Sequence, residues 1–313
     1  MRQFFSKLAA NESLAGYAFI LPNLLGFLIF TLLPVIASLC LAFVKWDVLT
    51  PPHFVGIKNF VDLLGFHRAS GHHIPNDPLF WKYLYNTVFF MLNIPICVIA
   101  SLMVALMMNQ KLRGITIYRT AFFLPTICSG VAVCLLWRWI LNPDFGLLNV
   151  LLTNISTFFH FDFTPPLWLM DTTWAKPALM VMGLWGGIGG MNMILYLAAL
   201  QNVPKELYEA AEIDGAGAWT KFRTVTVPFI SPTTFFITIM SIIGGFQGGF
   251  MQAYVMTGGG PAGATTTIEY YIYSNAYEWF KMGYASSIAW FLFVVIFIVT
   301  LINWRFGGKR VHY

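Results

Sequence analysis

Residues 282–304 read MGYASSIAWFLFVVIFIVTLINW and contain no acidic or basic side chain. About 20 apolar helical residues cross the hydrocarbon core of a membrane, so this stretch predicts a membrane span. A charged side chain at the centre of such a helix costs about 3 kcal/mol, so charges mark where spans end. Segmentation by charge gives six expected spans, at about residues 14–44, 84–108, 118–140, 177–200, 229–249 and 283–304.

The composition also indicates a membrane protein. Hydrophobic residues make up 58% of the 313 residues and charged residues only 10%, whereas an average soluble protein is about one quarter charged. This balance excludes a soluble fold, collagen, a coiled coil and a disordered chain. We expect an all-α integral membrane protein, with the first apolar run kept as an anchor because it is too long for a signal peptide.

The charge distribution predicts which loops face the cytoplasm. With six spans and a cytoplasmic N-terminus, the C-terminus is also cytoplasmic, and most basic residues fall on that side, as the positive-inside rule requires. We therefore ascribe the net charge of +5 to topology and expect no nucleic-acid partner. The segment 145–161 is short and polar for a seventh span, and we expect an interfacial amphipathic helix there. The basic residues assigned to the cytoplasmic side are Arg2, Lys7, Lys111, Arg113, Arg119, Lys205, Lys221, Arg223, Arg305, Lys309 and Arg310.

No residue pattern predicts a metal centre or a catalytic site. The four cysteines lie in apolar runs without C-x-x-C spacing. His67, His72 and His73 cluster near Asp77, but no helix-spaced ligand accompanies them, so we expect a solvated loop. Neither a Ser/His/Asp set nor a P-loop is present in the sequence, and we expect no enzymatic activity and no ATP hydrolysis by this chain.

The most polar connection between spans is residues 201–228, which we expect to form a helix, a turn and a second helix. Pro204 suits a first helical turn, Glu206 and Glu209 suit the positive N-terminal end of the helix dipole, and Gly215 permits a left-handed turn. From these residues alone, a solvated connector helix and a helix that docks on another protein are both open.

This connection resembles the EAA loop of binding-protein-dependent ABC importer permeases, whose pattern is EAA-x3-G-x9-I-x-L-P. Glu209-Ala210-Ala211 and Gly215 match the pattern, and Val225-Thr226-Val227-Pro228 differs from its end only by two conservative changes. In that family the loop precedes the penultimate of six spans, which is its place here.

Further segments resemble the sugar and glycerol-phosphate (maltose-type) branch of that family, and the resemblance covers about residues 14–306. Each segment is a weak signal, but their order agrees with the branch. They are Leu21-Pro22 and Pro34 in the first span, the segments 54–60 (FVGIKNF), 118–125 (YRTAFFLP) and 139–143 (WILNP), and 257–261 (TGGGP).

The resemblance implies a single transmembrane permease domain over residues 1–313, with the type I ABC importer fold, in a bacterial inner membrane. It implies that Glu209, Ala210, Ala211, Asp214 and Gly215 form a coupling helix for a separate ATPase, which would hold the ATP and Mg²⁺. Its implied partners are a second homologous permease, two ATP-binding cassette subunits, an extracytoplasmic solute-binding protein and lipid. An ion-coupled secondary carrier is the alternative, but the six apolar stretches contain no carboxylate for a coupling ion.

Polar and aromatic residues in or near the later spans are candidates for the path of a carbohydrate or polyol, because polar groups at membrane depth face the protein interior or a cavity. Hydrogen bonds across helices would explain each of them equally well. The candidates are Asn93, Trp185, Asn192, Tyr196, Gln247, Gln252 and Tyr254.

Small residues also recur in two spans. Gly186 and Gly190, and Gly244, Gly245, Gly248 and Gly249, follow small-xxx-small spacing, for which we favour close helix packing over a moving gate. We expect Arg119 and Arg138 to extend to the lipid headgroups at the inner and outer mouths.

Overall fold

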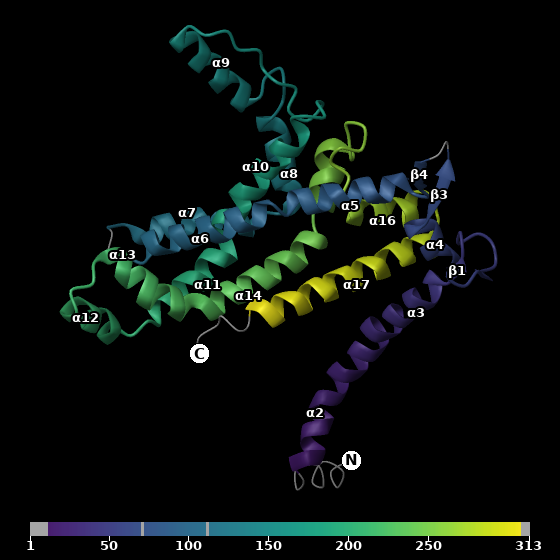
Figure 1. Cartoon of the computed structure of the whole chain (residues 1–313), viewed down its shortest axis with the longest axis horizontal. Helices are drawn as coiled ribbons and strands as arrows, with labels where there is room; N and C mark the ends of the chain where they lie inside the picture. The colour runs from purple at the N-terminus through teal and green to yellow at the C-terminus, as the bar shows by residue number, and fades with distance from the viewer. Residues whose placement is uncertain (1–11, 70–71, 111–112, 308–313) are drawn as a thin grey trace, which may run out of the picture. The chain divides into compact units, whose positions relative to one another are not determined.

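A computed structural model describes residues 12–69, 72–110 and 113–307 (Figure 1). Most of these residues are helical, as the composition predicts. Five of the basic residues assigned to the cytoplasmic side, Arg2, Lys7, Lys111, Lys309 and Arg310, lie outside the described residues.

The chain divides into two compact units, of which the first contains residues up to Asp77 together with Ile272–Phe291. Its N-terminal part is a helix interrupted by a π-helical turn, followed by two short antiparallel hairpins and a small helix. The elements are α2 (Glu12–Phe27), the π-helix η1 (Leu28–Leu32), α3 (Leu33–Ala42), β1 (Val44–Lys45), β2 (His53–Phe54), α4 (Lys58–Leu64), β3 (Phe66–Ala69), β4 (His72–Pro75), the π-helix η4 (Ser274–Glu278) and the start of α17 (Met282–Gly307).

The second unit contains Pro78–Tyr271 and the chain from Leu292 onward. It is a helical bundle whose chain order places the 201–228 connection before its longest helix. The elements are α5 (Pro78–Phe90), α6 (Asn93–Met108), α7 (Ile115–Ile127), α8 (Gly130–Ile140), α9 (Leu147–Phe159), α10 (Ala175–Ile188), α11 (Gly190–Gln201), α12 (Lys205–Ile213), α13 (Ala218–Lys221), the π-helix η2 (Phe222–Thr226), α14 (Val227–Phe246), α15 (Phe250–Gln252), the π-helix η3 (Ala253–Thr257) and most of α16 (Ile268–Tyr273).

Five continuous helical stretches are long and apolar enough to cross a membrane, and a bent pair makes a sixth if it counts as one span. The five stretches are Ala15–Ala42, Pro78–Met108, Ala175–Gln201, Ala218–Phe246 and Met282–Arg305. The bent pair is α7 and α8, which meet at 101° between Ile127 and Gly130. The span expected at 118–140 thus consists of two helices and not one, because Cys128 and Ser129 have extended backbones and break the helix.

Proline explains two of the π-helical turns. In η1 and η2 the closing N–H belongs to the residue before a proline: Leu33 N–H bonds to the Leu28 carbonyl before Pro34, and Val227 N–H bonds to the Phe222 carbonyl before Pro228. A proline lacks an N–H and clashes with the carbonyl four residues back, so a wider turn accommodates it without breaking the helix. The helical stretch Ala218–Phe246 thus continues through Pro228.

The core of the second unit lies where α6, α11 and α14 meet. It contains the fully buried side chains of Ala105, Met193, Tyr196, Ile230 and Ile237. Beside it, α6 packs on α10 through a polar ridge: the Asn93 side chain donates to the Met180 carbonyl at 2.9 Å, and Ser101 Oγ donates to the Gly187 carbonyl at 3.1 Å. These bonds to the backbone require close approach, which the glycines of α10 permit.

The predictions for the histidine segment and for residues 145–161 can also be compared with the structure. The segment with His67, His72 and His73 is not an irregular loop but the β3–β4 hairpin, in which His67 Nδ1 lies 2.9 Å from Asn76 Oδ1. No group of three metal-binding side chains occurs within residues 12–69, 72–110 and 113–307. The 145–161 segment does contain a short apolar helix, α9, which projects away from α8 and α10 (Figure 1).

Candidate functional site

The 201–228 connection folds as the helix, turn and helix that its sequence predicts. Helix α12 begins after Pro204, which takes the N-cap position with an extended ψ of 134° rather than the first helical turn that we expected. Gly215 has a φ of +77°, the left-handed conformation that glycine adopts without strain. Beyond it, α13 continues through η2 into α14 without a break.

Two backbone hydrogen bonds close the C-terminal end of α12. The Ala216 N–H donates to the Ala211 carbonyl at 2.8 Å, and the Gly215 N–H donates to the Glu212 carbonyl at 3.0 Å. This pair of bonds, spanning five and three residues, is a Schellman motif, which needs a left-handed residue where Gly215 stands. The backbone hydrogen bonds of this motif therefore explain the spacing between the EAA triplet and Gly215, because the motif places its left-handed residue four positions after Ala211.

Two side-chain contacts fasten α12 to the start of α14. Tyr208 Oη lies 2.9 Å from the Oγ1 of Thr226, which is buried, and Lys221 Nζ forms an ion pair with Glu212 Oε1 at 2.6 Å. Both contacts connect α12 with the α13–η2 segment that leads into α14. The loop is thus held against the base of a membrane helix.

The opposite face of α12 points away from the bundle. Glu206, Glu209 and Ala210 are exposed there, and Ile213 is 87% exposed. Within the described residues no hydrogen bond or ion pair involves the side-chain carboxylate of Glu209. An apolar side chain and an unengaged carboxylate on one face suit a contact with another protein.

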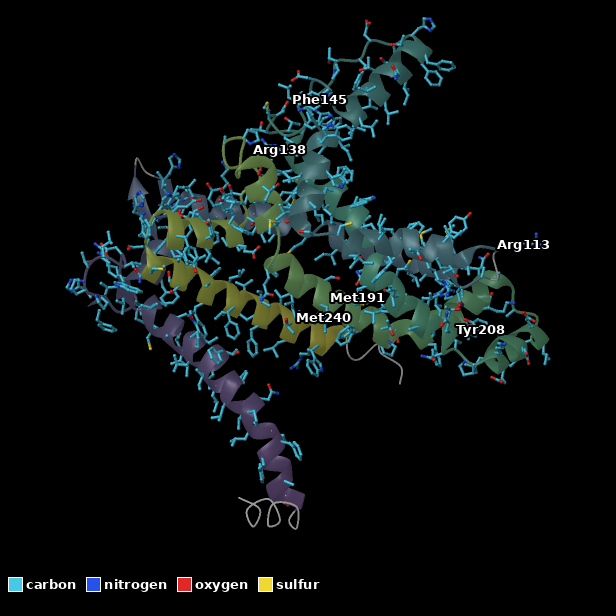
Figure 2. All side chains as sticks on the ribbon, turned by 180° about the vertical axis from the view of Figure 1, so that it is seen from behind. Arg113, Arg138, Phe145, Met191, Tyr208 and Met240 are labelled. Carbon is cyan, nitrogen blue, oxygen red and sulfur yellow. The ribbon has the colours of Figure 1, made fainter. Side chains whose placement is uncertain are left out.

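The 201–228 connection and the segment that contains Arg138 and Phe145 occupy opposite ends of the second unit. Figure 2 shows Arg113 and Tyr208 at one end and Arg138 and Phe145 at the other, with Met191 and Met240 between them. We expected Arg119 to extend to the lipid headgroups; in the structure its Nη2 donates to the Met108 carbonyl at 2.8 Å and so caps α6. Arg138 is exposed.

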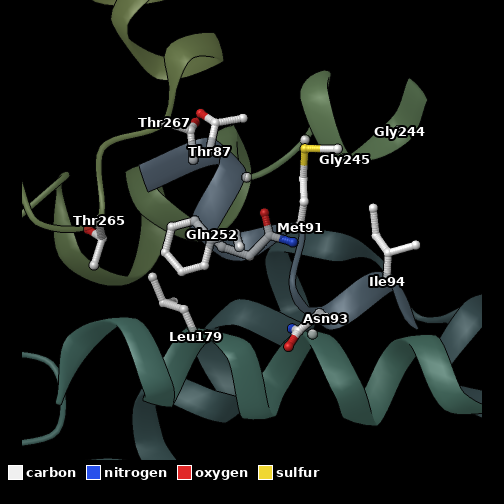
Figure 3. A pocket seen from close by; sticks show the side chains of 14 residues that line it. Thr87, Met91, Asn93, Ile94, Leu179, Gly244, Gly245, Gln252, Thr265 and Thr267 are labelled. Atoms are coloured by element: carbon white, nitrogen blue, oxygen red, sulfur yellow. The ribbon is translucent and has the colours of Figure 1, made fainter. Parts of the chain in front are cut away.

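A cavity of about 210 Å³ lies within the second unit (Figure 3). It is bounded by the junction of α5 and α6, by α10, by the end of α14 and by the chain that follows α14. Its fourteen lining residues are Thr87, Phe90, Met91, Asn93, Ile94, Leu179, Gly183, Gly244, Gly245, Gly248, Gly249, Gln252, Thr265 and Thr267.

Two of the seven path candidates, Asn93 and Gln252, line this cavity together. In Figure 3 Gln252 extends among the lining side chains, with Asn93 and Leu179 below it. Asn93 uses its Nδ2 on the Met180 carbonyl, while its buried Oδ1 has no hydrogen-bond partner among the described residues. No hydrogen bond within the described residues engages the Gln252 amide.

The short helix α15 that carries Gln252 is fixed by a carboxylate. Glu269 Oε2 accepts a hydrogen bond from the Phe250 N–H at 3.0 Å, at the first residue of α15. Burial raises the pKa of the Glu269 carboxyl, and the hydrogen bond from Phe250 opposes that rise. Gly249, with a φ of +93°, permits the turn, and a side chain there would collide with Thr267.

The other five path candidates lie apart from the cavity lining. Tyr196 is buried in the core, Trp185 packs edge-on against Trp137 with ring centroids 6.0 Å apart, and Asn192 is half-buried in α11. Gln247 is exposed at the end of α14. Tyr254 lines a separate outer groove with Arg138 and stacks on Phe250 at 5.3 Å.

The glycines have two different environments. A Cβ on Gly187 or Gly245 would come within 3.0 Å of Cys97 Sγ or Met91 Cγ, so close packing explains these two positions. Gly244 faces open space at the cavity. Thr87, Thr265 and Thr267 also line the cavity but were not among the predicted path residues, although the run Thr265-Thr266-Thr267, which begins four residues after Pro261 of the TGGGP segment, could have indicated the last two.

Comparisons with known proteins agree with this architecture. The profile of the family described as "Binding-protein-dependent transport system inner membrane component" matches residues 78–306. The chain is 35% identical over 312 residues to the probable ABC transporter permease protein YesP of Bacillus subtilis, covering 98% of this chain and 95% of that protein. It is 34% identical over 310 residues to the lactose transport system permease protein LacF of Rhizobium radiobacter, covering 97% and 98%.

A solved structure shares the fold. A bacterial ABC transporter involved in the import of the acidic polysaccharide alginate superposes with a TM-score of 0.79 over 98% of this chain and 99% of that one, at 24% identity. The chain belongs to the family of binding-protein-dependent transport system inner membrane components. It is thus an ABC importer permease rather than the ion-coupled secondary carrier that was the alternative.

Proposed function

We propose that this chain forms half of the translocation pathway of an ATP-driven importer for a carbohydrate or related polyol. The exposed face of α12 carries the proposal, because Glu209 and Ala210 are exposed there while Tyr208 and the Glu212–Lys221 ion pair fasten the helix to the segment that leads into α14. The carbohydrate class is supported by the relative LacF, whose name describes lactose transport.

The proposed assembly contains a second homologous permease, two ATP-binding cassette subunits and an external solute-binding protein. The ATPase would receive α12, with Glu209, Ala210, Ala211, Asp214 and Gly215 at or near the contact. ATP and Mg²⁺ would be held by the ATPase, and α12 would transmit its closure to the spans. The alginate importer supports an external partner, since a structure of it includes an alginate-bound periplasmic protein.

The proposal also implies which end of the second unit faces the cytoplasm. The α12 end of the second unit would face the cytoplasm, and the end with Arg138 and Phe145 would face outward, in a bacterial inner membrane. The solute would pass the cavity lined by Asn93 and Gln252. Tyr254 and Arg138 would lie at its outer entrance.

Affinity purification of the tagged chain from native membranes in mild detergent tests the assembly. Mass spectrometry should find a P-loop ATPase and a second six-span permease in the eluate. A chain recovered alone, yet able to move solute along an ion gradient in liposomes, would contradict the proposal.

Glu209→Lys tests the coupling contact. The reversed charge should reduce ATPase recovery and solute uptake by at least about tenfold, because a charge-assisted hydrogen bond at a contact contributes about 1.5–3 kcal/mol. Asp162→Lys, which makes the same change in charge at an exposed residue beyond α9, is the control and should retain both. Equal ATPase recovery and uptake in the two variants would remove Glu209 from the contact.

A further inference from the structure

The cavity beside Gln252 contains no charge. None of its fourteen lining residues is acidic or basic, and most of the wall is glycine, Phe90, Met91, Ile94 and Leu179. From this lining we infer that the cavity binds an uncharged glycosyl or polyol unit and that it discriminates against acidic sugars, with Gln252 as the residue that determines specificity. The inference rests on the proposed function and adds the charge class of the substrate.

The hydrogen-bonding groups of the cavity suit hydroxyls. A primary amide presents two donors and one acceptor, so the unengaged Gln252 side chain can both donate to and accept from neighbouring hydroxyls of one ring. The two threonines at positions 87 and 265 are already occupied: Thr87 Oγ1 donates to the Tyr83 carbonyl and accepts from the Ile268 N–H, and Thr265 Oγ1 donates to the Gly260 carbonyl. Gln252 therefore supplies the free donors of the lining, and Asn93 Oδ1 adds one acceptor.

The shape of the wall suits one sugar ring. A volume of about 210 Å³ is below the roughly 300–1,000 Å³ typical of pockets for drug-sized ligands. Phe90 offers an aromatic surface, and the glycines let a ring approach the backbone at the end of α14. Gly244 leaves open space through which a longer saccharide could extend.

The two lysines nearest in sequence to the cavity lining make contacts with groups that do not line the cavity. Lys82 Nζ, on α5, donates to the Ala262 carbonyl, and Lys176 Nζ, on α10, lies 4.9 Å from the ring centroid of Tyr85 and 5.1 Å from that of Phe89. Neither lysine lines the cavity. A carboxylate or phosphate that enters would thus lose its hydration without gaining a counter-charge, which is unfavourable.

The test uses proteoliposomes that contain the full complex and its solute-binding protein. They are supplied with ATP and with a mixture of equal concentrations of neutral mono- to trisaccharides, polyols, uronic acids and sugar phosphates. Mass spectrometry identifies which solutes accumulate. Wild type, Gln252→Glu, Gln252→Leu and Gln247→Glu are compared; Gln247 is exposed five residues earlier and does not line the cavity, so it is the matched control.

The expected result is accumulation of neutral solutes only, reduced at least about tenfold in both Gln252 variants and unchanged in Gln247→Glu, with equal ATPase recovery in all four complexes. Accumulation of an acidic solute by wild type, accumulation of no solute by an ATP-hydrolysing complex, or undiminished uptake by the Gln252 variants would each overturn the inference. Failure of the wild-type chain to recover an ATPase would instead contradict the proposed function.

Discussion

Asn59 is the residue through which the segment after the first expected span folds back on that span. Its Nδ2 donates to the Ala42 carbonyl at 2.8 Å and to the Val44 carbonyl at 3.0 Å, and the residue is 8% exposed. One amide thereby satisfies the last carbonyl of α3, which has no partner within the helix, and the carbonyl of Val44 in β1.

Replacing Asn59 by alanine should therefore destabilise the first unit. Leaving buried carbonyls unsatisfied costs about 1–3 kcal/mol, so the midpoint of thermal denaturation in detergent should fall. Lys58→Ala, at the exposed neighbouring position, is the control and should leave the midpoint unchanged. Equal midpoints for the two variants would show that the two hydrogen bonds contribute nothing to stability.

For single residues, the sequence predicted only some of the roles that the structure shows. It marked the segment 54–60 by resemblance but gave no role to Asn59, because the partners of Asn59 are backbone carbonyls 15 and 17 residues earlier. The same limit applied to the path candidates. Asn93 and Gln252 share one cavity while Tyr196 is in the core, and that separation depends on helix rotation, which an apolar run does not reveal.

Among the elements, the turn after α12 depends on one glycine. Gly215→Ala places a side chain at a φ of +77°, which costs about 1–2 kcal/mol, and should open the Schellman motif. Hydrogen–deuterium exchange of the α12 amides should become about five- to thirtyfold faster. Gly217→Ala is the matched control, because Gly217 has a φ of −68° and no atom within 4 Å of the added Cβ. Similar exchange in both variants would rule out a conformational requirement at Gly215.

The contact between α6 and α10 offers a second matched pair of glycines. A Cβ at Gly187 would lie 2.6 Å from Cys97 Sγ, whereas a Cβ at Gly186 meets nothing within 4 Å. Gly187→Ala should lower the free energy of unfolding by about 1–3 kcal/mol, through overpacking, and Gly186→Ala should not. Thermal denaturation in detergent measures both.

Cys97→Ala, which removes the clashing sulfur, should restore much of the stability that Gly187→Ala loses. If the double variant is no more stable than Gly187→Ala alone, the packing described for α6 and α10 is incorrect.

Helix positions were largely predictable because apolar length and charge determine which segments can cross a membrane. The 101° bend between α7 and α8 was not, since neither Cys128 nor Ser129 is charged and the bend depends on their extended backbones. The end of α12 was predictable, because only glycine readily takes the left-handed conformation that the turn needs.

For the whole molecule, the six-span topology predicts that α9 and α12 face opposite sides of the membrane. Phe158→Cys on α9 and Ile213→Cys on α12 test this, because these side chains are 76% and 87% exposed. In a chain whose four native cysteines have been replaced, a membrane-impermeant maleimide should label Phe158→Cys in intact spheroplasts and Ile213→Cys only after permeabilisation. Labelling of both positions from the same side would mean that Ala175–Gln201 does not cross the membrane, and the reverse labelling pattern would mean that α7 and α8 do not together make one crossing.

Residues 218–246 form one uninterrupted helical rod of 29 residues, about 44 Å long at 1.5 Å per residue. At one end Tyr208 and Lys221 tie α12 to it, and at the other end Gly244 and Gly245 belong to the cavity wall. A continuous helix of this length acts as a lever: a tilt of the end that contacts α12 would displace Gly244 and Gly245 in the cavity wall. Because any energetic coupling between two binding sites is reciprocal, a solute bound at the proposed cavity would in turn change the free energy of the contact that α12 makes.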